Sequence, residues 1–126
     1  MNKLIIDVAS EKIFLMIITN SNIYNITKDN TKNNYEKLTL IINEFLNSNK
    51  MTINDINKIY LNRGPGSFAG IRNSLSVVKA FNLVKNIDYY CYSFDDFEYE
   101  KDIKHENIPH LCEKFKIKKN LIKPKY

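Results

Sequence analysis

All three glycines and both arginines of this 126-residue chain lie in one ten-residue window, from Arg63 to Arg72. The window reads RGPGSFAGIR, whereas the rest of the chain is rich in Asn, Ile and Lys. Glycine adopts backbone angles that other residues avoid and lets a second group approach the main chain closely. Arginine offers a planar fork of donors that lysine cannot imitate. The concentration of both residue types therefore indicates a constraint of geometry or chemistry at this window.

The net charge of +5 comes entirely from the end of the chain. Residues 1–100 hold eleven basic and eleven acidic side chains, whereas residues 101–126 hold eight lysines and three acids. Two interpretations stay open for this basic segment. It is either a solvated, partly disordered tail, or an arm that touches nucleic-acid phosphates without reading sequence.

No segment of the sequence predicts a membrane-bound or secreted protein. The longest apolar run, residues 13–18, is far shorter than a membrane span, and the early acid at Asp7 is unlike a signal peptide. Two isolated cysteines are expected of a protein in a reducing cytosol. His105 and His110 are expected to be surface residues of a poorly ordered tail, because their spacing does not place them on one helix face. We therefore expect a cytoplasmic protein without a metal site.

Five short segments rich in β-branched and aromatic residues have the composition of strands. They are residues 3–7, 13–18, 23–27, 58–62 and 89–93. Apolar residues at i, i+3 and i+4 spacing predict a helix over residues 35–46, and a second helix is predicted over residues 71–85. Thr52 and Asp55 form a capping-box pattern that predicts a single turn. A short helix is also predicted near residues 111–115.

The order of these elements is β-β-β-α-β-α-β, which predicts an α/β fold. Short connections make the first three strands an antiparallel meander, and helical crossovers make the later strands parallel. The result is a mixed five-stranded sheet of the ribonuclease H-like kind. The second helix is apolar on more than one side, which predicts a second packed surface against another helix or a partner.

A strand, a glycine-rich turn and a helix start together form a ready-made anion site. The glycine spacing excludes a Walker A loop. Gly64, Gly66 and Ala69 fit the dinucleotide pattern GxGxxA, but that pattern expects an acid after the next strand, and Asp88 precedes it. A purely structural interpretation also stays open, in which the loop turns the chain sharply and lets Phe68 plug the core.

The wider segment from residue 62 to residue 72, NRGPGSFAGIR, closely resembles the loop of the TsaB family, also called YeaZ, which usually reads GRGPGSFTGhRhG with h apolar. The start of the chain, LIIDVAS at residues 4–10, is similar to the family's hLhIDTS. The resemblance covers residues 1–93, and the final Pro-x-Tyr is also similar. Departures include Ala69 for the usual Thr and Tyr35 where a His often stands, and they bear on nucleotide contacts more than on partner contacts.

The resemblance implies a ribonuclease H-like, actin-like ATPase lobe over residues 1–94, with a short basic tail over residues 95–126 in place of a second lobe. It implies a non-catalytic scaffold that binds a TsaD-type enzyme and is joined by a TsaE-type ATPase. This complex would make N6-threonylcarbamoyladenosine at position 37 of tRNAs that read ANN codons. Contact with tRNA would be indirect or through the basic tail. No cofactor of the chain's own is implied, and ATP, ADP or a metal would lie at the partner interface.

Pairing in the family uses the two helices of the first lobe. The predicted partner-facing residues are Tyr35, Leu38, Ile42, Phe45, Phe68, Ile71, Leu75 and Val78. We expect Leu75→Glu or Val78→Glu to abolish the complex while leaving the monomer folded.

The predicted loop and phosphate-contact residues are Asp7, Ser10, Arg63, Gly64, Gly66, Ser67, Gly70 and Arg72. Asp7 stands where an actin-like ATPase would hold magnesium through water, but the residues that follow it lack the glycine that would wrap phosphates closely. Ser67 has no His–Asp partner, so no catalytic residue is predicted. Two alternative functions remain: a small nucleotide-binding enzyme that uses the Gly64–Gly70 loop, and a self-associating homodimer formed through the same helices.

Overall fold

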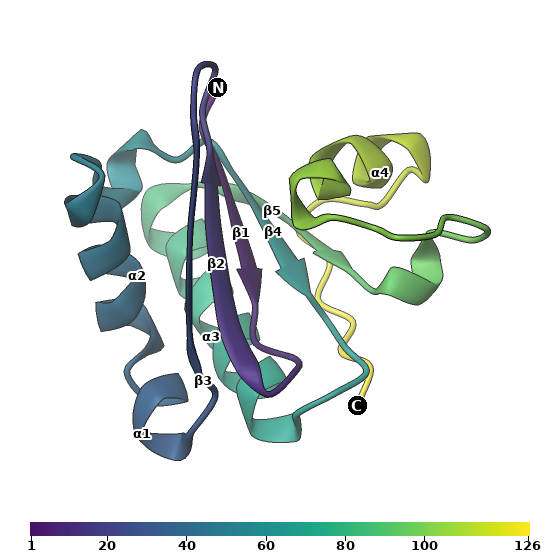
Figure 1. Cartoon of the computed structure of the whole chain (residues 1–126), viewed down its shortest axis with the longest axis horizontal. Helices are drawn as coiled ribbons and strands as arrows, with labels where there is room; N and C mark the ends of the chain where they lie inside the picture. Colours follow the sequence, from purple (N-terminus) through teal and green to yellow (C-terminus); the bar gives the residue numbers. More distant parts are fainter.

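One mixed sheet of five strands, in the order β3-β2-β1-β4-β5, organises the computed structural model, which describes residues 1–126 (Figure 1). The strands are β1 (Lys3–Asp7), β2 (Lys12–Ile18), β3 (Ile23–Asp29), β4 (Lys58–Asn62) and β5 (Asp88–Tyr92). β1, β2 and β3 pair antiparallel, whereas β1, β4 and β5 pair parallel. The predicted order of strands and long helices along the chain and the predicted mixed five-stranded sheet are therefore confirmed.

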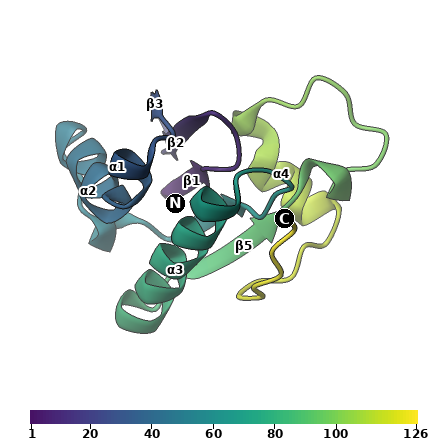
Figure 2. The same cartoon turned by 90° about the horizontal axis from the view of Figure 1, so that it is seen from below.

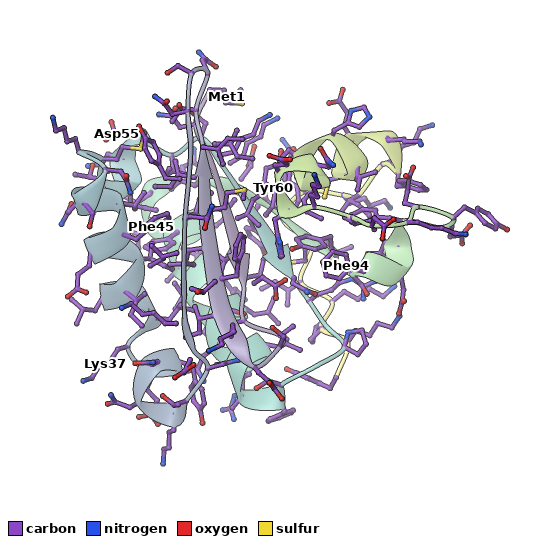
Figure 3. All side chains as sticks on the ribbon, in the orientation of Figure 1. Met1, Lys37, Phe45, Asp55, Tyr60 and Phe94 are labelled. Carbon is purple, nitrogen blue, oxygen red and sulfur yellow. The ribbon has the colours of Figure 1, made fainter.

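Three helices cover one face of the sheet (Figure 2). They are α1 (Lys32–Tyr35), α2 (Leu38–Ser48) and α3 (Phe68–Lys85). Successive residues of a strand point to opposite faces, so Leu4 and Ile6 of β1 pack with Phe45 of α2 in the larger hydrophobic core (Figure 3). Burial of large apolar side chains, worth about 1.5–3 kcal/mol each, fixes both long helices on this face.

The predicted helix bounds differ from the observed ones at their starts. The segment predicted as one helix over residues 35–46 includes the end of α1, which starts where the Thr31 hydroxyl accepts a hydrogen bond from the Asn34 amide. α2 begins only at Leu38, because the backbone of Lys37 is not helical. α3 begins at Phe68 rather than at residue 71, because Ser67 caps it. The capping box at Thr52 is confirmed, since its amide donates to the Asp55 carboxylate over 2.9 Å.

Residues 94–117 cover the opposite face of the sheet, and residues 118–126 run along the edge of β5 to the glycine loop (Figures 1 and 2). This segment contains the turns η2 (Phe94–Asp96) and η3 (His105–Asn107) and the helix α4 (Ile108–Lys114). Ile108 and Leu111 pack against Ile5 and Tyr60 in a second, smaller core. The expectation of a poorly ordered tail is therefore wrong for this part of the segment, while the short helix predicted near residues 111–115 is confirmed at slightly earlier bounds.

None of the helices combines the length and the apolar character that a membrane span requires.

Candidate functional site

The glycine loop connects β4 to α3 at the carboxyl end of the parallel strands, where ligands bind in many α/β folds. Gly64 has a φ of +107°, which residues with a side chain rarely adopt, and a Cβ atom there would lie 2.0 Å from the Lys125 carbonyl oxygen. A Cβ atom at Gly66 would lie 2.0 Å from the Ala9 carbonyl oxygen. The close approach that glycine permits is thus made by the chain's own backbone. This geometry supports the interpretation in which the glycines serve a sharp, tightly packed turn.

Ser67 and Phe68 begin α3. The Ser67 amide donates to the Ala9 carbonyl over 2.8 Å, and the Ser67 hydroxyl accepts from the Gly70 amide over 3.2 Å. The serine therefore caps the helix and anchors it to the β1–β2 turn. Phe68 does not plug the core, because its side chain is 57% exposed and packs against the ring of Tyr126.

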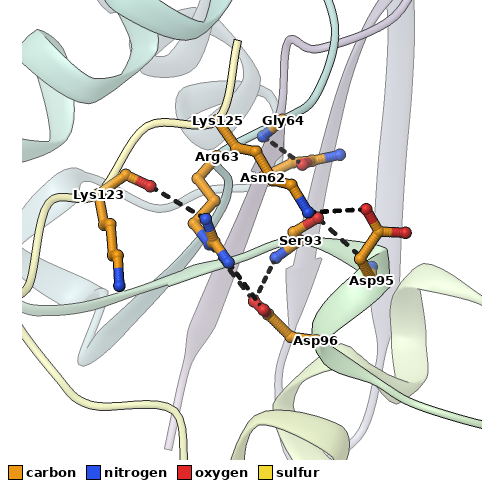
Figure 4. Close-up of polar contacts among 8 residues, drawn as sticks. All are labelled: Asn62, Arg63, Gly64, Ser93, Asp95, Asp96, Lys123 and Lys125. Carbon is orange, nitrogen blue, oxygen red and sulfur yellow. Dashed lines mark hydrogen bonds and ion pairs between the residues drawn. The ribbon is translucent and has the colours of Figure 1, made fainter.

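Arg63 forms a forked ion pair with Asp96 (Figure 4). Its Nη2 and Nε atoms lie 2.7 and 3.3 Å from the two carboxylate oxygens, and its Nη1 donates to the Lys123 carbonyl over 3.2 Å. Charge-assisted forked bonds of this kind are stronger than single neutral ones. The guanidinium thus links the end of β4 to η2 and to the last residues of the chain. It is therefore not free to bind a phosphate. Arg72 lies exposed on α3 and makes no ion pair.

Asp7 lies buried at the end of β1, and protein groups surround its carboxylate. Its Oδ1 accepts from the Ala9 amide over 3.2 Å. Its Oδ2 accepts from the Asn62 amide group over 3.2 Å and lies 2.9 Å from His105 Nε2. The His105 ring stacks on Phe14 with the ring centroids 4.0 Å apart. The predicted surface position of His105 is therefore wrong, because this ring packs onto the sheet beside a buried acid.

Asp7 and His105 are 98 residues apart in sequence, so no local spacing links them. The structure brings Asp7, Arg63, Gly64, Gly66, Ser67 and Gly70 together at one end of the sheet. Ser10 lies beside them but is exposed, and its hydroxyl donates only to the Lys12 carbonyl over 3.4 Å. Sequence patterns indicated the loop and Asp7, but not Asn62, Asp96 or His105.

The polar groups at this end of the sheet form a structural network. No group of three or more His, Cys, Asp or Glu side chains is placed to hold a metal ion. Asp7 and His105 contact each other, and neither forms a hydrogen bond to a serine or cysteine side chain. Burial raises the pKa of Cys91 and of Cys112 to about 12, so both thiols stay protonated and unreactive at neutral pH.

The residues predicted to face a partner lie mostly inside the molecule. Six of them are at most 6% exposed and belong to the chain's own core: Leu38, Ile42, Phe45, Ile71, Leu75 and Val78. Their helical spacing indicated a buried stripe, and the sheet already covers that stripe. Only Tyr35, which is half-buried, and Phe68 reach the surface.

The outer surface of α2 and α3 carries other apolar side chains. Leu40 of α2 is 53% exposed, and Leu83 and Val84 of α3 are 73% and 77% exposed. Val77 and Phe81 are half-buried nearby on the same helix. α3 also packs against α1 and α2, so helices of this chain supply the second packed surface predicted for this segment, and the exposed apolar side chains lie outside the predicted set. We call Leu40, Leu83 and Val84 the outer apolar positions.

Comparison with known proteins identifies the family. The family model described as "TsaD: tRNA N6-adenosine threonylcarbamoyltransferase" matches residues 23–93. The "tRNA threonylcarbamoyladenosine biosynthesis protein TsaB" of Buchnera aphidicola subsp. Baizongia pistaciae is 38% identical over 66 residues, which cover 52% of this chain and 30% of that protein. This chain spans about a third of the length of the curated relatives it matches.

Two solved structures share the fold. YeaZ from Pseudomonas aeruginosa aligns with a TM-score of 0.67 and 17% identity over 73% of this chain and 43% of that one. RuvC from Thermus thermophilus aligns with a TM-score of 0.50 and 9% identity over 91% of this chain and 80% of that one. These similarities confirm the predicted ribonuclease H-like fold. The family-model match spans more than half of the chain, including α2, the glycine loop and α3, so this chain belongs to the TsaD family of tRNA N6-adenosine threonylcarbamoyltransferases and their TsaB (YeaZ) relatives.

Proposed function

We propose that this chain is a non-catalytic subunit in the biosynthesis of N6-threonylcarbamoyladenosine in tRNA, and that it acts by binding a TsaD-type enzyme. Its membership of the family and the name of its curated relatives support the pathway. The observation that carries the binding role is the exposure of large apolar side chains on α2 and α3, above all the neighbours Leu83 and Val84 of α3. Neighbouring exposed apolar side chains are typical of protein interaction sites.

The polar end of the sheet supports a binding role over a catalytic one. Asp7 is already contacted by three protein groups, and the Arg63 fork is filled by Asp96. The glycine loop packs against the chain's own carbonyl oxygens. ATP, ADP or a metal would accordingly belong to the partner enzyme or to the shared interface. The modified position, adenosine 37 of tRNAs reading ANN codons, would be selected by the partner.

The proposed interface is the outer surface of the two long helices. Fully burying Leu83 and Val84 would contribute about 1.5–3 kcal/mol each. Phe68 is a further exposed apolar side chain at the other end of α3, and Arg72, which is exposed without an ion pair, is available for a carboxylate of the partner. A TsaE-type ATPase would join this pair, and tRNA would be contacted mainly through the enzyme.

Size-exclusion chromatography with light scattering, on the full chain mixed with a TsaD homologue from the same genome, tests the proposal. We expect a one-to-one complex with the wild-type chain and with Tyr99→Glu. Tyr99 is 97% exposed and lies between η2 and η3, outside α2 and α3, which makes it a matched control. The double variant Leu83→Glu with Val84→Glu should elute separately from the enzyme while keeping its helical circular dichroism.

Two results would contradict the proposal. Separate peaks for the wild-type chain and the enzyme, with ATP and tRNA also present, would mean that the chain does not bind the enzyme. Equal loss of the complex in Tyr99→Glu and in the double variant would mean that the interface does not lie on α2 and α3. A stable dimer of the wild-type chain that Leu83→Glu dissociates, and that ignores the enzyme, would instead favour the homodimer.

A further inference from the structure

A pocket of about 540 Å³ opens between α4 and the sheet, at the amino-terminal end of β1 and β4. Its strand residues stand at the other end of these strands from Asp7 and the glycine loop. The helix α4 that borders it lies on the other face of the sheet from α2 and α3 (Figure 1). Its volume is in the range of sites that hold small ligands. None of the residues that line it takes part in the loop network or the proposed partner surface.

Two lysines stand side by side at this pocket. Lys3 of β1 and Lys58 of β4 are register partners on neighbouring strands, so their side chains leave the same face of the sheet. Both are half-buried, and neither has a carboxylate within ion-pair distance, although six other basic side chains of the chain do. Lys116 adds a third cation to the lining, against the single carboxylate of Glu113. Neighbouring like charges in a partly desolvated position repel each other, and a bound anion would offset this repulsion.

Aromatic rings line the pocket beside these cations. Tyr60 and Tyr90 are register partners on β4 and β5, and their rings stack with centroids 5.2 Å apart and planes 14° from parallel. Tyr90 is half-exposed, and the Lys58 ammonium lies 5.8 Å from the centre of its ring.

Tyr60 supplies an unused polar group. Its side chain is 4% exposed and lines the pocket beside α4 (Figure 3). Burial raises the pKa of Tyr60 well above its usual value. The hydroxyl therefore stays protonated at neutral pH and can both donate a hydrogen bond to a ligand in the pocket and accept one from it.

We propose that this pocket binds a nucleotide, with its phosphate against Lys3, Lys58 and Lys116 and its base against Tyr90 and the Tyr60 hydroxyl. Ammonium groups recognise phosphates through charge-assisted hydrogen bonds, and aromatic rings stack bases of any sequence. A phosphate alone would leave the aromatic lining unused, whereas a nucleotide uses both parts. The nucleotide is either a free nucleoside phosphate or an unpaired nucleotide of an RNA strand. The pocket lies apart from the outer apolar positions, so this proposal does not depend on partner binding.

Isothermal titration of the full chain with AMP, inorganic phosphate and a short single-stranded oligoribonucleotide tests the proposal. We expect saturable binding of AMP that is weakened at least tenfold by Lys58→Gln and unchanged by Lys79→Gln. Lys79 is exposed on α3 and makes no ion pair, so it matches the change in charge. Tyr90→Leu should weaken AMP binding without changing the binding of phosphate. Tighter binding of the oligoribonucleotide than of AMP would identify RNA as the source, and equal or weaker binding would identify a free nucleotide.

Several results would overturn the proposal. One is the lack of saturable binding for both AMP and the oligoribonucleotide. Another is an equal loss in Lys58→Gln and Lys79→Gln, which would indicate a diffuse effect of charge. If inorganic phosphate binds as tightly as AMP, the base does not contribute to the affinity, and the proposed contacts with the base are wrong. Circular dichroism of each variant separates loss of binding from loss of fold, and Tyr90→Leu gives a second readout that leaves every lysine in place.

Discussion

The two faces of the sheet are built from different kinds of contact. On the face covered by α2 and α3, apolar residues repeat at helical spacing and fill one continuous core with β1 and β4. On the face covered by residues 94–117, a smaller apolar centre separates two polar ends, with Lys3 and Lys58 at one and Asp7 at the other. The first face holds the larger hydrophobic core, and its helices carry the proposed partner surface. The second holds its polar groups, and these depend on segments far apart in the sequence.

The largest expected effect is the difference in stability between a glutamate substitution on the buried face of α3 and one on its exposed face. Leu75 is 6% exposed, so Leu75→Glu places a carboxylate in the core and should cost about 4 kcal/mol or more. Leu83→Glu, at a position 73% exposed, should change stability by less than about 0.5 kcal/mol. Urea denaturation of both variants measures the difference. The sequence-based expectation that Leu75→Glu leaves the monomer folded is therefore replaced, and similar stabilities for the two variants would contradict the assignment of the two surfaces.

The second-largest expected effect concerns whether residues 94–126 unfold together with the rest of the chain. Ile108 is fully buried against the second face, so Ile108→Ala should cost about 3 kcal/mol through lost burial and the cavity it leaves. The same truncation at Ile23, which is 47% exposed on the edge strand β3, should cost far less. Thermal denaturation followed by circular dichroism compares them. A single transition that shifts with Ile108→Ala is expected, whereas an unchanged main transition would mean that the second face folds separately.

The contrast between the faces also explains what the sequence could predict. Strands, long helices and the loop follow from local patterns of apolar residues, turns and caps, and these were predicted within a few residues. The role of the apolar stripe was misassigned, because helical spacing identifies a buried face without saying whether the sheet or a partner covers it. His105 and Asp96 could not be found, because each acts on a residue far away in the sequence, and no local pattern records such a pairing.

A smaller effect concerns the joint between β4 and the C-terminal segment. Arg63→Lys keeps the charge but loses the forked geometry on Asp96, together with the bond to the Lys123 carbonyl. Both partners of the pair are largely buried, with 15% and 22% of their side chains exposed, so the expected cost is about 1.5 kcal/mol. The control is Arg72→Lys, at an exposed position without an ion pair, which should leave the urea midpoint unchanged. An equal shift in both variants would mean that the fork adds no stability beyond its charge.

The smallest effect lies at the surface of the same joint. The Lys125 ammonium lies 2.8 Å from the Asp95 carboxylate, and this hydrogen bond lowers the pKa of Asp95 below its ordinary value of 3.8. Because the folded-state pKa is the lower one, the pair stabilises the fold above pH 3.8 and loses that contribution as the pH falls through the folded pKa. Melting temperatures of the wild-type chain and Lys125→Gln should therefore differ slightly at pH 6 and converge below pH 3.8. Added salt should shrink the difference at pH 6, because exposed pairs are screened. A difference that persists at low pH would assign the effect of Lys125 to its aliphatic chain instead of to its charge.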